Sequence, residues 1–183
     1  MGHFISDDRL IRLGHQLLCA LLAAYDFPDL YRERGEYPHH ERDPLDDLRS
    51  LEDSDFSENL VMLSALARAN DDERQTLEAV EKVLPRGVGT LEENGTNKPL
   101  TPREACNKII HAKEISYQLD WSEEHPVWNK FYERQRAVVK GKFKNPRITV
   151  TGTTQSGREW KAEINAINFL LGVSTEYWQW NLA

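Results

Sequence analysis

Residues 101–112 read TPREACNKIIHA, and this short stretch decides how the chain is divided. Thr101 is a capping residue, Pro102 suits the first helical position and Glu104 follows the cap by three residues, which together predict the start of a helix. The helix is expected to run from Pro102 to about Lys113. Helical patterns precede it and strand patterns follow it, so this segment is the junction between two parts of the chain.

Three amphipathic segments precede the junction helix. Apolar residues recur at helical spacing in residues 6–25, 55–70 and 73–84, the last either as a new helix or as a bent extension of the second. Residues 29–44 are polar and are predicted to be a surface loop. Residues 85–99 contain several prolines and glycines, and we expect a poorly ordered loop there.

Beyond the junction, apolar and polar side chains alternate. The alternation covers residues 115–121, 148–152 and 160–164 and predicts strands with one buried face. The segment 154–157 is expected to join the last two strands as a hairpin, and Asn165 to cap a final helix. The predicted class is α+β: an N-terminal helical bundle (about 1–113), then a small antiparallel sheet with a β-hairpin and a short C-terminal helix (about 114–183), in one domain of residues 1–183.

Composition limits the classes of protein to consider. The chain has 183 residues, of which 39% are hydrophobic and 29% charged, as is typical of a single globular domain. Its longest apolar run, residues 17–24, is too short to cross a bilayer, and we see no signal peptide before it. Cys19 and Cys106 lie in apolar helical patterns and offer neither a disulfide framework nor a metal motif. We therefore expect a cytoplasmic protein with no membrane segment, metal or cofactor.

One face of the junction helix carries a polar row. Arg103, Asn107 and His111 are each four residues apart and so lie on one side of a helix. These side chains suit metal-free phosphodiester cleavage. A guanidinium can hold the phosphate, an amide can orient the reacting groups, and an imidazole can move a proton near neutral pH. Spacing alone favours a plainer interpretation, a solvated face with an ion pair between Glu104 and Lys108.

The order of amino acids in this helix adds a further observation. The segment REACNKIIHA (103–112) resembles the signature helix of HEPN domains, helical bundles in which an arginine, often followed by a polar residue, precedes a histidine. Many of them are metal-independent ribonucleases of toxin–antitoxin, abortive-infection and CRISPR systems, with two motifs facing each other across a dimer cleft. The resemblance implies a homodimer with His111, Arg103 and Asn107 as catalytic residues. The order of motif and strands also resembles small bacterial proteins with no assigned function.

The motif also departs from the family pattern. Cys106 stands directly before Asn107, where the RNxxxH form has its arginine, and Arg103 lies further from His111 than is usual in the family. This departure favours an alternative of a different class, a catalytically inactive dimeric protein that binds a protein partner.

Charge is spread unevenly along the chain. The formal net charge of −7 argues against bulk non-specific binding of nucleic acid. Residues 41–58 are acidic, whereas residues 134–147 contain six basic residues and no acid. This basic segment either follows an RNA backbone, with an aromatic ring for stacking, or forms a lysine-rich strand edge that blocks aggregation. The predicted nucleic-acid-binding residues are Arg134, Arg136, Lys140, Lys142, Lys144, Arg147 and Phe143.

The C-terminal tail contains Tyr177, Trp178 and Trp180, which either cover the protein's own core or anchor a second subunit. The predicted function is a metal-independent endoribonuclease or an RNA-binding component of a bacterial defence or toxin–antitoxin system. Its expected partners are a second copy of the chain, RNA, and a protein such as an antitoxin or another defence-system component. In the alternative, an inactive dimer binds its protein partner through the acidic segment or the aromatic tail.

Overall fold

The computed structural model describes residues 7–23, 44–84, 87–124 and 140–174, and their arrangement confirms the α+β class. Within these ranges every helix is too short or too polar to cross a membrane. The helices are α1 (Asp7–Ala23), α3 (Pro44–Arg74), α4 (Thr76–Val83), α5 (Pro102–Ile110) and α7 (Ala166–Ser174). The strands are β1 (Gly89–Glu93), β2 (Thr96–Leu100), β3 (Glu114–Glu124), β4 (Lys140–Thr153) and β5 (Glu159–Asn165).

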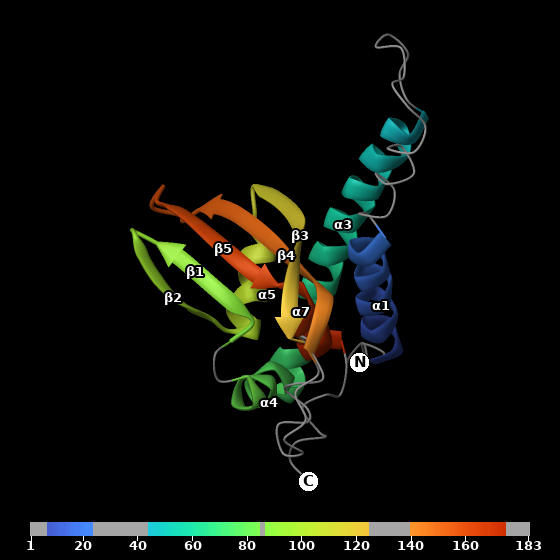
Figure 1. The fold of residues 1–183 in the computed structure, drawn as a ribbon. Coiled ribbons are helices and arrows are strands. Elements are labelled where there is room, and N and C mark those ends of the chain that lie inside the picture. The colour runs from blue at the N-terminus through green and yellow to red at the C-terminus, as the bar shows by residue number, and fades with distance from the viewer. Residues whose placement is uncertain (1–6, 24–43, 85–86, 125–139, 175–183) are drawn as a thin grey trace, which may run out of the picture.

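The strands form one antiparallel sheet in the order β2-β1-β5-β4-β3. The predicted hairpin is confirmed, because β4 and β5 pair from Arg147 opposite Asn165 to Thr153 opposite Glu159. The helices lie on one face of this sheet (Figure 1), and Val150 on β4 is among the side chains buried beneath them. The opposite face is polar and is not covered by any of the described helices.

Residues 85–99 are not the loop that their composition predicts. They contain β1 and most of β2, which are joined by Asn94 and Gly95 with φ values of 55° and 70°. Positive φ at both positions is what a tight two-residue hairpin turn requires. β1 pairs with β5 on its other side, placing the buried Leu91 opposite the buried Ala162, and this burial outweighs the polar composition. Two strands therefore precede α5, and strands are not confined to the residues after 113.

The second helix is longer than its apolar periodicity indicates, since α3 runs from Pro44 to Arg74. Gln75 then adopts a left-handed conformation with a φ of 55°, which an α-helix cannot contain. Residues 76–83 consequently form a separate helix, which confirms the first of the two alternatives for this segment, a new helix, and not a bent extension of the second helix.

The helical layer packs through the apolar faces that the sequence predicts. Leu13, Leu17 and Leu21 of α1 are buried, and α7 crosses α1 where Gly14 meets Ser174. The cap of α7 is also confirmed, because the Asn168 N–H donates to Asn165 Oδ1 at 2.9 Å. A Cβ added at Gly14 would overlap the side chain of Ser174, so the close approach of the two helices depends on this glycine.

We expect Gly14→Ala to destabilise the protein by about 1 kcal/mol or more, because overpacking of a core typically costs about 1–3 kcal/mol. At an uncrowded helical position the same change stabilises by about 1 kcal/mol, so the sign is informative. The free energy of unfolding in urea measures it. Ser174→Gly should be less harmful in the Gly14→Ala background than in the wild type, and additive effects would contradict this helix crossing.

Candidate functional site

The helix α5 begins as predicted. Thr101 Oγ1 accepts a hydrogen bond from the Glu104 N–H at 3.2 Å, with Pro102 at the first helical position. The predicted division of its faces is confirmed for most positions. Asn107 and His111 are exposed, Ile110 is half-buried, and the buried positions include Ala105, Cys106 and Ile109.

Arg103 is held by two carboxylates at the end of α3. Its guanidinium donates one hydrogen bond to Asp71 Oδ2 and another to Asp72 Oδ1, the latter at 2.7 Å. Asp71 is 3% exposed, and its other oxygen, Oδ1, accepts a hydrogen bond from the Leu77 N–H in α4 at 2.8 Å. The Asp71 carboxylate therefore ties the end of α3 to both α4 and α5, with Arg103 as its partner from α5.

Asn107 has a partner that the sequence analysis missed. The Arg68 Nε on α3 donates a hydrogen bond to Asn107 Oδ1 at 2.9 Å. The same guanidinium lies 3.3 Å from Asp72 and 3.5 Å from Asp71. The sequence shows that Arg68 precedes Asp71 and Asp72 by three and four residues, which is the spacing of ion pairs on a helix. The contact of Arg68 with α5 depends instead on how the two helices pack.

His111 lies at the C-terminal end of α5, where its backbone N–H donates to the Asn107 carbonyl at 3.2 Å. Its imidazole is exposed and has no hydrogen-bond partner among the described residues. Eight residues at a rise of about 1.5 Å per residue separate Arg103 from His111 by about 12 Å along the helix axis. The structure therefore places His111 close to Asn107 in the helix but distant from Arg103.

Cys106, at the position where the HEPN signature has arginine, faces the core. Burial raises the pKa of its thiol to about 12, so the thiol is neutral at pH 7 and is a poor nucleophile or metal ligand. Because residue 106 is fully buried, a guanidinium at this position would not reach solvent in the observed packing. No cluster of three side chains able to hold a metal ion occurs in the described part of the chain.

The predicted nucleic-acid-binding residues separate into groups. Arg134 and Arg136 lie outside the described residues. Arg147 pairs with Asp120 at 3.0 Å and with Glu163 at 2.8 Å on the uncovered face of the sheet. Hydrogen bonds from Lys161 and Arg147 hold the pKa of Glu163 below its usual value. The Lys144 Nζ donates to the Leu22 carbonyl at the end of α1 at 3.0 Å, while Lys140 and Lys142 are exposed.

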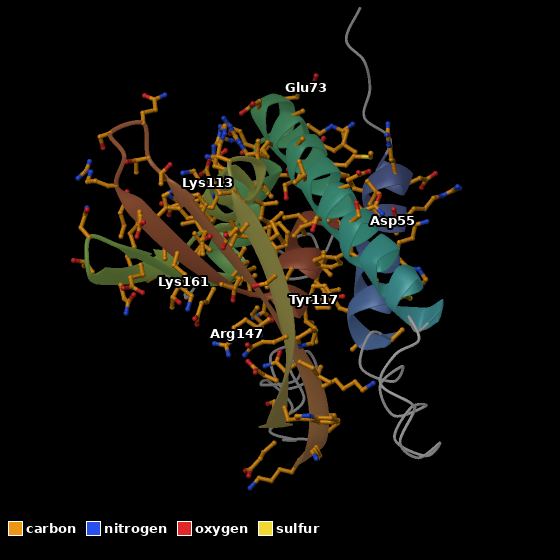
Figure 2. The ribbon with its side chains drawn as sticks, turned by 90° about the horizontal axis from the view of Figure 1, so that it is seen from above. Asp55, Glu73, Lys113, Tyr117, Arg147 and Lys161 are labelled. Atoms are coloured by element: carbon orange, nitrogen blue, oxygen red, sulfur yellow. The ribbon has the colours of Figure 1, made fainter. Side chains whose placement is uncertain are left out.

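The lysines lie on a two-stranded ribbon formed by the last residues of β3 and the first residues of β4. β5 pairs with β4 only from Arg147 onward, so residues 140–146 have β3 as their one described neighbour in the sheet. Figure 2 shows the paired ends of β3 and β4 running past the other strands.

The two faces of this ribbon carry different aromatic residues. Trp121 and Lys142 share one face, with the Lys142 Nζ 4.4 Å from the centroid of the indole. Phe143, the aromatic residue that the sequence analysis selected, lies on the other face, half-buried and close to Gly141. Trp121 is 51% exposed, although the strand alternation places it on the buried face.

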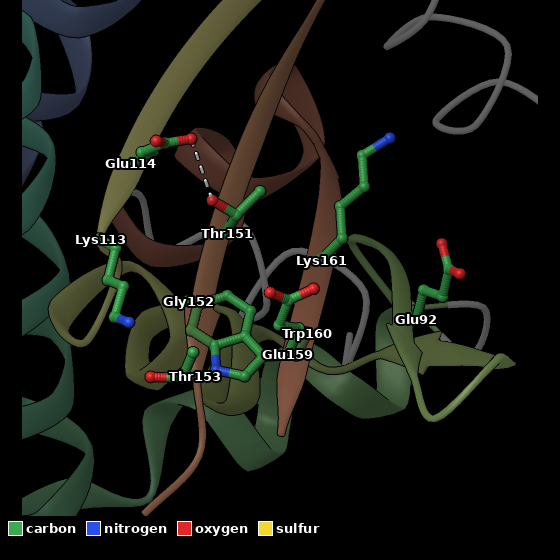
Figure 3. Close-up of a pocket in the computed structure, with 9 residues that line it drawn as sticks. All are labelled: Glu92, Lys113, Glu114, Thr151, Gly152, Thr153, Glu159, Trp160 and Lys161. Atoms are coloured by element: carbon green, nitrogen blue, oxygen red, sulfur yellow. Dashed lines mark hydrogen bonds between the residues drawn. The ribbon is translucent and has the colours of Figure 1, made fainter. Parts of the chain in front are cut away.

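Among the described residues, two cavities lie near the sheet and the helices. The first does not include any of the predicted site residues, and the second, which includes Arg103, is acidic. A cavity of about 530 Å³ (Figure 3) combines charges of both signs, and its Glu114 accepts a hydrogen bond from Thr151 at 3.4 Å. It is lined by Glu92, Lys113, Glu114, Thr151, Gly152, Thr153, Glu159, Trp160 and Lys161. A second cavity of about 350 Å³ beside Arg103 is lined by Asp71, Asp72, Gln75, Glu78, Glu81 and Arg103. Its four carboxylates disfavour a phosphate there.

No protein-family model, curated protein or solved structure matches the chain. The HEPN resemblance therefore depends on residues 103–112 and the helices before them, and it stays a prediction. The tail residues Tyr177, Trp178 and Trp180 lie outside the described residues, so the homodimer that they favour stays a prediction too.

We expect Asp71→Ala to lower the free energy of unfolding by about 2–4 kcal/mol, because it removes the capping acceptor of α4 and leaves two guanidinium groups without their buried carboxylate. Asp72→Ala is the matched control. Its carboxylate is exposed, and its loss should cost less than about 1 kcal/mol. Denaturant titration of both variants measures the difference, and equal losses would show that the buried carboxylate has no special role.

Proposed function

We propose that the protein binds RNA at the start of β4 and does not cut it. The observation that carries the proposal is the pair of exposed lysines, Lys140 and Lys142, on a ribbon that extends beyond the rest of the sheet. Lysines that contact phosphates release counterions from RNA, and this release is a main source of binding free energy. Because the whole chain carries a net charge of −7, RNA should be attracted to this basic segment and repelled elsewhere.

The geometry of α5 supports binding without cleavage. Arg103 already shares its guanidinium between Asp71 and Asp72, so it is neutralised and engaged in holding helices together. A phosphate at Arg103 would have to displace one of these carboxylates and enter a cavity lined by two further glutamates. Arg103 and Asn107 of the polar row are therefore best explained as contacts between α5 and α3.

We expect RNA binding to weaken as salt is raised, with a linear dependence of log K on log salt concentration. Lys140→Ala and Lys142→Ala should each weaken binding and reduce the slope by about one, because each removes a phosphate contact. Fluorescence anisotropy of a labelled oligoribonucleotide measures both quantities, and gel analysis should show the RNA intact. Lys82→Ala on α4 removes an exposed lysine elsewhere and is the control. Salt-independent binding, or an equal effect of Lys82→Ala, would refute the proposal.

A second candidate, metal-independent RNA cleavage, is favoured by one specific contact. Arg68 places a guanidinium on Asn107, and His111 follows Asn107 by one helical turn. Arg68 would then take the role of the arginine that the resembled motif carries next to its polar residue. His111 would remove the proton from a ribose 2′-hydroxyl or donate one to the leaving oxygen.

Cleavage assays separate this candidate from the first. If His111 moves a proton, His111→Ala should lower the cleavage rate by about 100-fold or more without unfolding the protein, and a chelator should have no effect. His15→Ala removes another exposed histidine and should leave the rate unchanged. Intact RNA after prolonged incubation with the wild-type protein would reject the nuclease.

A further inference from the structure

We infer that Trp121 is a stacking platform for an unpaired base, and that the RNA bound at the ribbon is therefore single-stranded. The inference rests on the proposed function, RNA binding at the start of β4. It adds the residue that contacts a base and the kind of RNA that fits.

The exposure of Trp121 follows from where the helical layer ends. Tyr117, on the same face of β3, packs against Phe56 of α3 with ring centroids 4.6 Å apart. Four residues further along β3, Trp121 is 51% exposed, the highest value among the exposed large hydrophobic residues of the described chain. Lys144, the register partner of Trp121, reaches the Leu22 carbonyl at the end of α1, yet the indole itself stays half exposed and accessible to a ligand.

The surroundings of Trp121 favour a ligand that combines a flat ring with negative charge. The Lys142 ammonium lies over the indole at 4.4 Å, a cation–π contact that limits the motion of both side chains. Lys144 is the register partner of Trp121 on β4, and Lys140, at the end of the ribbon, is the register partner of Glu124. Stacking on the indole face opposite the Lys142 ammonium would bring the phosphate that flanks a base within reach of Lys142.

A nucleic acid fits this surface better than a protein does. Lysine is depleted in protein–protein interfaces, whereas here three lysines, Lys140, Lys142 and Lys144, belong to the same short ribbon as the tryptophan. Aromatic side chains that stack on bases, combined with cations along the backbone, are the usual means of binding single strands. In a duplex the bases stack on one another and their faces are hidden, so a lone indole gains little from duplex RNA.

The test compares Trp121→Ala with Trp121→Phe in anisotropy titrations with labelled oligouridine at one salt concentration. Trp121→Ala should weaken binding by about 5- to 100-fold, as expected for the loss of one stacked base, whereas Trp121→Phe should retain most of the affinity. The salt slope of Trp121→Ala should equal that of the wild type, because no phosphate contact is lost, while Lys142→Ala lowers the slope. Met62→Ala, which removes an exposed apolar side chain from α3, is the control for surface hydrophobicity.

The outcomes distinguish the inference from the function on which it rests. If the wild type binds oligouridine and Trp121→Ala binds it equally well, the stacking platform is refuted and RNA binding stands. Tighter binding of a duplex than of oligouridine also refutes it. If the wild type binds neither RNA, the proposed function fails as well. Unchanged thermal midpoints of the variants exclude misfolding as the cause of a lost affinity.

Discussion

The buried carboxylate of Asp71 is the constraint on which the arrangement of the helices depends. A buried charge is costly unless it is paired and hydrogen-bonded, and Asp71 meets this condition only when three elements are in place. Its own helix supplies Arg68, α4 supplies the Leu77 N–H and α5 supplies Arg103. Because α5 leads within a few residues into β3, and the Lys113 N–H donates to the Thr151 carbonyl at 2.8 Å, the placement of α5 also sets how β3 meets β4.

Local interactions explain which elements could be predicted from the sequence. Three predicted features depend only on neighbours within a few residues, and all three are found in the structure. They are the leucine face of α1, the cap of α5 at Thr101 and the cap of α7 at Asn165. The β1–β2 hairpin was not predicted, because its strands depend on neighbours that are distant in the sequence. Asn94-Gly95 is a strong turn signal, but β1 gains its buried neighbours from β5, far along the chain, and its own sequence is dominated by charged and small residues.

The same limit applies to the candidate site. A helical wheel identifies Asn107 and His111 as exposed, but it cannot show that Arg68 reaches Asn107 from another helix or that Arg103 is neutralised by Asp71 and Asp72. Alternation along β3 correctly assigns Trp121 to the face shared with Tyr117. The pattern of a strand contains no information on where the helices that cover it end, so the exposure of Trp121 emerges only in three dimensions.

The strand order has a consequence for how the chain acquires its structure. β5 lies between two pairs of strands, β1 with β2 and β4 with β3, and among the described strands it is the last to be synthesised. Until it emerges from the ribosome, the two pairs have no common neighbour, and Leu91 and Val150 on their apolar faces lack Ala162 between them. Contacts between residues so distant in sequence slow folding, because a long loop must close before they form. The sheet is therefore expected to close only after β5 has been translated, which leaves a period when its apolar surface is open to chaperones or to aggregation.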